Sequence, residues 1–346
     1  MSTAAGAENR NTDVSEPSRE VAHRAMEEAA EWYALLISGE ATDSDHIRWR
    51  SWLADHGEHR RAWSYVESVS NRVLAPLQQT HDPRLTSDSL CAANGRLLKR
   101  RRVFTRIAAF AGVSLLGLSG WYRSSLGQYA SIIAADHRTV IGDIREVSLA
   151  DGTRVWLNTA SAFNEDYQLR LRRLHLIAGE ILVTTAADAS RPFVVDTAQG
   201  RMRALGTRFT VRLEEEKTFL AVYQGKVEIT TADSGAVVVI PAGQQTLFDS
   251  NIFSPLSTAD PARQAWSQGQ LIAWDLPLKN IVQELRRYSS GHVGVAPELA
   301  ERRVFGTYPL RDVEGTLTML ADAVQGRVRR PLPWWSSIEA NDLPQN

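Results

Sequence analysis

The spacing of apolar residues along the chain changes from a helical period to a strand period. Before residue 80, apolar side chains recur every three to four positions, as Ala25, Ala29, Trp32 and Leu36 do. Because this spacing places them on one face of a helix, amphipathic helices are expected there. After Ala135, apolar and polar residues alternate instead, which is typical of half-buried β-strands.

Three helices are expected in the first part of the chain, over residues 19–38, 42–57 and 58–77. Thr42 can cap the second helix, with Asp45 three residues later to complete the cap. Ile47, Trp52 and Leu53 would then share the inner face of that helix. Together the three helices predict an all-α domain over residues 1–85.

Tryptophan is frequent in this predicted domain, which contains Trp32, Trp49, Trp52 and Trp63. Large aromatic side chains bury much apolar area, so most are expected in the core, and any surplus would be an exposed binding anchor. The first 80 residues also carry 13 acidic and 8 basic side chains. DNA binding depends on neutralising phosphates, so this acidity opposes a DNA-reading helical domain and favours a basic protein partner.

Short strands separated by glycine-containing turns predict an all-β region over residues 136–250. Asp151 and Gly152 stand between two alternating stretches, which is the pattern of a tight β-hairpin. The strands are expected at residues 146–149, 154–157, 169–176, 180–184, 192–195, 208–213, 218–223, 227–231 and 236–240.

A further unit, with both strands and helices, is expected over residues 262–332. Its elements are predicted as strand 271–274, helix 277–288, strand 292–295, strand 303–308, helix 313–324 and a last strand near Val328. This βαβ-βαβ order describes a small α+β domain. The chain is therefore predicted to be a multidomain protein.

An apolar segment over residues 103–122 predicts one transmembrane helix between the helical domain and the β region. Ile107–Tyr122 is a run of 16 uncharged residues, and extension back to Val103, with the Arg106 side chain reaching the interface, gives 20. As a helix, 20 residues would extend about 30 Å, which is the thickness of a bilayer core. Six basic residues lie between Arg96 and Arg106, largely in a linker over 86–102. Positive residues are retained in the cytoplasm, so the N-terminus is expected there and the C-terminus in the bacterial periplasm.

Two other interpretations of this segment stay open, namely a buried core helix and a cleaved signal peptide. Arg101 and Arg102, followed by Phe104 and Arg106, also resemble a twin-arginine export signal. If that signal acts, the exported part would cross the membrane already folded.

Residues that could carry chemistry are scattered in this sequence. Cys91 is the only cysteine, so no intrachain disulfide can form. His137, His175 and His292, the histidines of the exported part, lack the spacing of metal ligands. No nucleophile elbow, phosphate loop or zinc-protease motif occurs. We therefore expect no enzyme activity, no catalytic residue, no metal and no cofactor.

Several short sequence pieces resemble the FecR-type transmembrane anti-sigma regulators of cell-surface signalling. They occur in the same order over nearly the whole chain: Ala30-Glu31-Trp32, Trp52-Leu53, His59-Arg60-Arg61-Ala62-Trp63, Leu149-Ala150-Asp151-Gly152-Thr153, Leu157-Asn158, Ala178-Gly179-Glu180, Arg191-Pro192-Phe193, Gly206-Thr207-Arg208-Phe209, Gly225-Lys226-Val227 and Leu285-Arg286-Arg287-Tyr288. No single piece is decisive, but their order around one predicted membrane span is specific.

The resemblance implies a regulator that binds an extracytoplasmic-function (ECF) sigma factor in the cytoplasm. It also implies a FecR-like β domain and a C-terminal domain of the STN type. That domain would receive a signal from the periplasmic signalling domain of a TonB-dependent outer-membrane transporter, often one for ferric siderophores. Site-1 and intramembrane proteases would carry the signal across the membrane, and no direct contact with nucleic acid is implied.

Two sets of candidate site residues are predicted, one in each of the two partner-binding domains. In the sigma-binding domain these are Trp32, Leu36, Trp49, Trp52, Leu53 and Trp63. In the receptor-signalling domain they are Trp274, Leu278, Leu285 and Tyr288. Two alternative functions stay open, a membrane-anchored transcription factor with a periplasmic sensor and an envelope scaffold without a signalling role.

Overall fold

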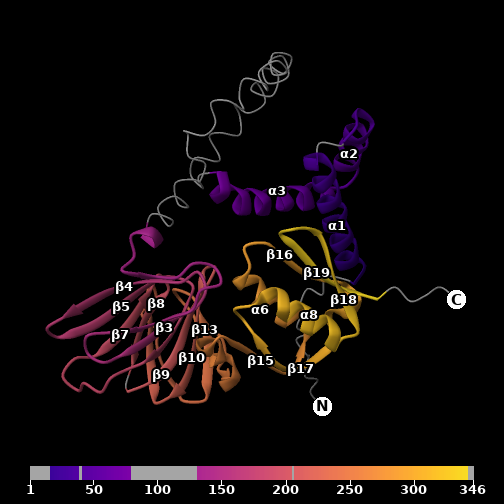
Figure 1. Ribbon diagram of the computed structural model, residues 1–346. Helices are drawn as coiled ribbons and strands as arrows, with labels where there is room; N and C mark the ends of the chain where they lie inside the picture. Colours follow the sequence, from indigo (N-terminus) through magenta and orange to yellow (C-terminus); the bar gives the residue numbers. More distant parts are fainter. Residues whose placement is uncertain (1–15, 39–40, 79–130, 205, 342–346) are drawn as a thin grey trace, which may run out of the picture. The chain divides into compact units, whose positions relative to one another are not determined.

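The computed structural model describes residues 16–38, 41–78, 131–204 and 206–341. Helices form the N-terminal part, and strands dominate the remainder (Figure 1), as the fold-class prediction stated. The chain divides into two compact units. One holds the helices with most of the C-terminal domain, and the other holds the β-rich region.

The predicted linker over 86–102, with Arg101 and Arg102, and the predicted span over 103–122 lie outside the described residues. None of the helices that the structure describes combines the length and the apolar content needed to cross a bilayer.

The three predicted N-terminal helices are present as α1 (Glu16–Ser38), α2 (Asp43–Asp55) and α3 (Gly57–Gln78). Thr42 caps α2, because its hydroxyl accepts from Asp45 N at 3.3 Å and its own N donates to Asp45 Oδ2 at 2.8 Å. Hydrogen bonds from Thr42 and Arg48 stabilise the carboxylate and lower the pKa of Asp45 to about 2. This reciprocal cap confirms the predicted start of α2.

The β-rich region consists of two seven-stranded sheets. In spatial order, the first sheet contains β1 (His137–Arg138), β4 (Ala162–Gln168), β5 (Leu171–Ala178), β7 (Phe193–Thr197), β8 (Gly200–Ala204), β11 (Lys226–Thr231) and β12 (Val237–Pro241). The second contains β14 (Ser257–Thr258), β13 (Gln244–Phe248), β10 (Lys217–Gln224), β9 (Arg208–Glu214), β6 (Glu180–Thr184), β3 (Arg154–Leu157) and β2 (Arg145–Ser148). Among these described strands only β5 and β7 pair in parallel.

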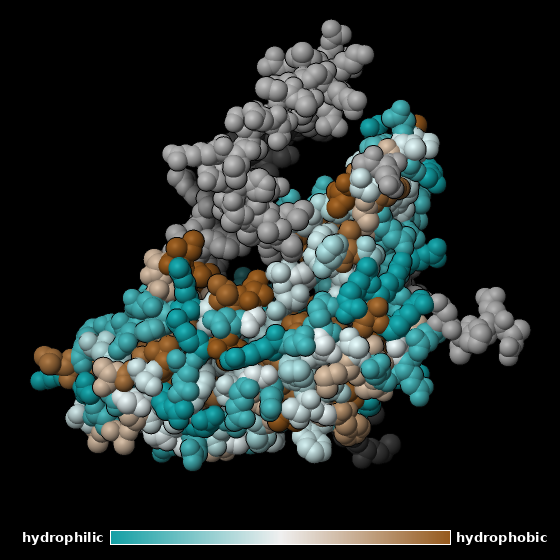
Figure 2. Space-filling model, in the orientation of Figure 1, coloured by the Kyte–Doolittle hydropathy of each residue, from teal (hydrophilic) through white to brown (hydrophobic). Residues whose placement is uncertain are grey.

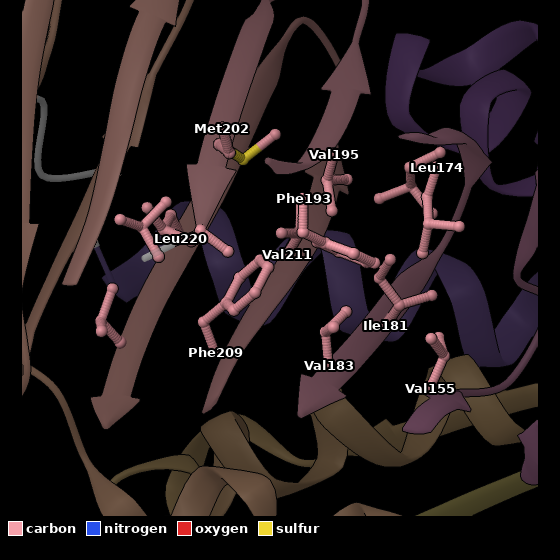
Figure 3. Packing of buried hydrophobic residues seen from close by; sticks show 14 of the residues in the cluster. Val155, Leu174, Ile181, Val183, Phe193, Val195, Met202, Phe209, Val211 and Leu220 are labelled. Carbon is pink, nitrogen blue, oxygen red and sulfur yellow. The ribbon is translucent and has the colours of Figure 1, made fainter. Parts of the chain in front are cut away.

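Side chains from both sheets meet in one apolar core, so the two sheets form a sandwich. Figure 3 shows the core between them, with Leu174, Phe193 and Met202 from the first sheet and Ile181, Phe209 and Leu220 from the second. These side chains are almost fully buried. Each contributes roughly 1.5–3 kcal/mol of hydrophobic stabilisation relative to an exposed position.

The Asp-Gly hairpin is confirmed, since β2 and β3 pair antiparallel on either side of it. Gly152 adopts φ +85°, and its N donates to Leu149 O at 2.9 Å. The sequence prediction did not include β4, β8 and β13, although all three are integral to the sheets.

The C-terminal domain contains the predicted βαβ-βαβ order with one unpredicted short helix between the two halves, and the 3-10 helix η3 (Pro261–Gln268) precedes it. Its elements are β15 (Gln270–Pro277), α6 (Leu278–Leu285), η4 (Arg286–Tyr288), β16 (His292–Val295), α7 (Pro297–Ala300), β17 (Arg303–Pro309), α8 (Val313–Ala323), β18 (Gly326–Leu332) and β19 (Trp335–Ala340). Strands β15 and β17 form one sheet, and β16, β19 and β18 form another. The last strand, β19, extends the domain past the expected end at residue 332.

Candidate functional site

Aromatic side chains of the helical domain contact one another across the three helices. The ring centroids of Trp49 and Trp63 are 4.9 Å apart, and those of Tyr33 and Trp63 are 5.9 Å apart. The guanidinium of Arg48 lies 5.9 Å from the ring centroid of Trp32, within the range of a cation–π contact. These contacts bring together three of the four predicted tryptophans with their neighbours.

The fourth tryptophan, Trp52, is held by a polar network that joins all three helices. Its Nε1 donates to Glu28 Oε2 on α1 at 2.6 Å. Its ring stacks on His59 of α3, with centroids 4.4 Å apart and an interplanar angle of 7°. Nδ1 of the same imidazole lies 2.7 Å from Trp52 O. Glu28 therefore fixes α2 against α1 through a charge-assisted hydrogen bond.

The six predicted sigma-binding residues, Trp32, Leu36, Trp49, Trp52, Leu53 and Trp63, are all half-buried. The fully buried positions of α1 and α3 carry small side chains, which line one apolar interface with Leu332 and Trp335 of the C-terminal domain, namely Ala25, Ala29, Ala30, Ala62 and Val66. The aromatic rings thus border this interface and retain exposed surface. A half-buried aromatic ring both stabilises the domain and can contact a partner.

One predicted position on α2 is wrong. Ile47 was expected to share the inner face with Trp52 and Leu53, yet its side chain is 65% exposed. Ile37, near the end of α1, is also exposed. With 3.6 residues per turn, Ile47 lies about 140° from Trp52 and about 120° from Leu53 around the helix axis, so the three side chains cannot share one face. The two exposed isoleucines are contact candidates that the sequence interpretation missed.

In the C-terminal domain only one of the four predicted residues lies on the surface. Leu278, Leu285 and Tyr288 are core residues, whereas the ring of Trp274 is 74% exposed. Phe305 on the neighbouring strand β17 is exposed too, and the prediction did not include it. The alternation in β17 could have predicted this exposure. Val304 and Tyr308 point to the buried side of the strand, so Phe305 points to the outer side.

Within the unit that contains α1–α3, the helices also contact the C-terminal strands. Arg329 on β18 forms ion pairs with Glu27, at 3.3 Å, and with Glu31. Tyr33 and Trp334 meet edge to face, with ring centroids 5.8 Å apart. These contacts require the two segments to lie on the same side of any membrane.

Among the described residues, no group of three His, Cys, Asp or Glu side chains is arranged to hold a metal ion.

Two crystal structures of a proposed anti-sigma factor from Parabacteroides distasonis ATCC 8503, at 2.50 and 1.65 Å resolution, are similar to this chain. Each is 21% identical to it with a TM-score of 0.48 and covers 60% of this chain, together with 98% or 99% of its own chain. No curated protein matches the chain.

Two protein families match parts of the sequence. Residues 135–228, from the start of the first sheet into β11, match the family described as FecR protein. Residues 27–69, which lie in α1–α3, match a domain of unknown function, DUF4880. The resemblance to the FecR-type regulators is confirmed. The β-rich region is called the FecR region below. FecR proteins are regulatory, so the prediction that the chain is not an enzyme is confirmed as well.

Proposed function

We propose that this chain is a single-pass regulator of the bacterial inner membrane. Its helical domain binds an ECF sigma factor in the cytoplasm. Its C-terminal domain, of the STN type, receives a signal in the periplasm from a TonB-dependent outer-membrane transporter. Site-1 and intramembrane proteases then act on the chain near the span over 103–122.

The observation that carries this proposal is the order of the parts. An acidic helical domain and a FecR region stand on either side of a 20-residue apolar segment that basic residues precede. The half-buried aromatic rings of the helical domain support a protein partner, since aromatic side chains are enriched at the energetic centres of interfaces.

One observation opposes the proposed topology. A membrane between residues 103 and 122 would separate Glu31 from Arg329, and their ion pair could then not form within one molecule. The contact and the span exclude each other, so the location of the two segments decides between them.

Sigma-factor binding is tested by co-purification of the tagged full-length chain with the ECF sigma factors of its own host. We expect the full-length chain to retain one sigma factor and a chain lacking residues 1–78 to retain none. Ile47→Asp should weaken retention about tenfold or more, because a charge at an interface anchor costs at least 1.4 kcal/mol, roughly the free energy of one decade in affinity.

Ile252→Asp provides the matched control. The side chain of Ile252 is 67% exposed, close to the 65% of Ile47, and it lies outside the helical domain. Retention should be unchanged in this variant. If the chain without residues 1–78 still retains the sigma factor, the proposed role of the helical domain is wrong. A DNA shift by the full-length chain at low salt would favour the membrane-anchored transcription factor instead.

A further inference from the structure

The first described residues of the FecR region expose three large apolar side chains close together in sequence. Ile133, Val140 and Ile141 are 68%, 71% and 42% exposed. Single apolar residues are common on protein surfaces, but a local concentration marks an interaction site. On the face shown in Figure 2, apolar residues (brown) interrupt a mainly polar surface (teal).

The backbone around Val140 and Ile141 is fixed, so the exposure of these two side chains does not come from a loosely held loop. Thr139, Val140 and Gly142 are each hydrogen-bonded to residues of the turn at 159–161, at 2.9, 3.1 and 2.8 Å. Thr139 itself is buried. The apolar side chains are therefore held in solvent by a well-anchored backbone.

This segment lies close in sequence to the proposed membrane span. Residues 123–130 separate Ser131 from the end of the span at Tyr122. Eight residues reach at most about 28 Å when fully extended. The bilayer surface is thus always within reach, and a tether this short gives effective concentrations of about millimolar. A weak affinity for lipid would suffice to keep the segment bound.

Exposed charges near the three side chains are balanced. Arg138 and Arg145 are exposed, and so are Asp136, Asp143 and Glu146, of which Glu146 is paired with Arg154. A contact through this surface would therefore depend on apolar burial more than on attraction to anionic headgroups. This balance fits a lipid interface whose composition matters little.

We propose that Ile133, Val140 and Ile141 insert into the periplasmic surface of the inner membrane and hold the FecR region against the bilayer. This inference rests on the proposed span, which delivers the segment to the membrane surface. The contact fixes the orientation of the FecR region relative to the membrane that a signal must cross.

The test uses the full-length chain in lipid nanodiscs, with Cys91→Ser and a single labelled cysteine at Ile141→Cys. The lipids carry brominated acyl chains, which quench an environment-sensitive dye on contact. We expect the dye at position 141 to lose about half of its emission, because interfacial insertion reaches the acyl boundary. Serine at both Ile133 and Val140 should remove most of this quenching.

Val239→Cys is the matched control, because its side chain is 45% exposed, against 42% for Ile141. It lies on β12, at the opposite edge of the sheet from β1. Six strand spacings separate these two edge strands, which corresponds to about 29 Å. The dye there should keep nearly all of its emission. Quenching of the dye at position 141 should be the same in nanodiscs of neutral phosphatidylcholine and in nanodiscs of anionic lipid.

Equal quenching at positions 141 and 239, or none at either in nanodiscs that contain the chain, would refute the membrane contact. A blue shift at 141 without quenching would mean that a protein, such as a second copy, covers the site, which also refutes it. If the chain does not enter nanodiscs at all, the proposed span fails, and that result is distinct from the others.

Discussion

Replacing Arg172 by alanine is expected to destabilise the FecR region by about 3–5 kcal/mol, since removing one partner leaves a buried charge unpaired. Arg172 Nη1 donates to Asp151 Oδ2 at 2.7 Å, and both side chains are 4% exposed. The guanidinium also donates to Arg191 O, at 2.8 Å, and to Ala186 O, at 3.1 Å. The loss would leave the Asp151 carboxylate and these carbonyls without their charged donor.

A matched control is available at the next residue. Arg173 pairs with Asp166, but these side chains are 30% and 42% exposed. Exposed pairs contribute only about 0–1 kcal/mol, so Arg173→Ala should have a small effect. Hydrogen exchange of the β5 amides in the full-length chain measures both changes. Equal losses in the two variants would contradict the importance of burial at Arg172.

The Arg172→Ala effect should also depend on pH. Burial raises the pKa of Asp151, but hydrogen bonds from Arg172 and Thr153 outweigh it and leave the pKa below its usual value. A lowered pKa means that this stabilisation is present above the unfolded-state pKa and is lost as the pH falls through the folded-state pKa. The difference between wild type and variant should therefore shrink in acid, where a protonated carboxyl needs no guanidinium.

Gly179→Ala is expected to destabilise the FecR region by about 2–3 kcal/mol more than alanine at an ordinary glycine with positive φ, because the added methyl group overpacks the site. Gly179 has φ +78°, and an added Cβ would lie 2.6 Å from Ser161 Cα, which is backbone and cannot move aside. Ser161 is itself fixed, because its Oγ accepts from Glu180 N at 2.9 Å.

Gly243→Ala separates backbone strain from this steric clash. Gly243 has φ +80° with no atom within 4 Å of an added Cβ, so it should cost only the left-handed conformation, about 1–2 kcal/mol. Denaturant unfolding of the full-length chain, followed by exchange of sheet amides, compares the two variants. Equal losses would show that the close approach at Ser161 does not constrain Gly179.

These two sites explain sequence pieces that carried the FecR resemblance. Asp151 acts as a turn residue and also as the buried partner of Arg172. Glu180, which follows Gly179, accepts from Asn158 Nδ2 through its Oε2 at 3.0 Å. Residues 21 or 22 positions apart in sequence form these contacts, so periodicity could not predict them, although it predicted the strands that carry Arg172 and Glu180.

Local patterns predicted much of the fold. The alanine stripe of α1, the Asp-Gly hairpin and the order of elements in the C-terminal domain all follow from short-range spacing. The missed strand β4 contains Asn164, Glu165 and Asp166, which resemble loop residues until their pairing with β5 is known. In β8, Arg201 and Arg203 alternate with buried residues, a valid strand pattern that was overlooked.

Burial in the two candidate sites was less predictable. Ala25 and Ala62 are buried in one cluster with Leu332 and Trp335 of the C-terminal domain, whereas the four tryptophans of the helices remain half-buried. Trp274 and Leu278 are near neighbours in sequence but differ completely in exposure, because one lies on a strand face and the other begins a helix. Only the three-dimensional packing distinguishes them.

The location of the helical domain and the FecR region relative to the membrane is the most direct test of the account. Single cysteines at Ile47 and Ile252, which are 65% and 67% exposed, would be placed in a Cys91→Ser chain. A membrane-impermeant maleimide is then applied to spheroplasts. We predict labelling at position 252 alone, and at both positions after lysis. Labelling of both in intact spheroplasts would place them on one side, contradict the proposed span and allow the Arg329–Glu31 contact.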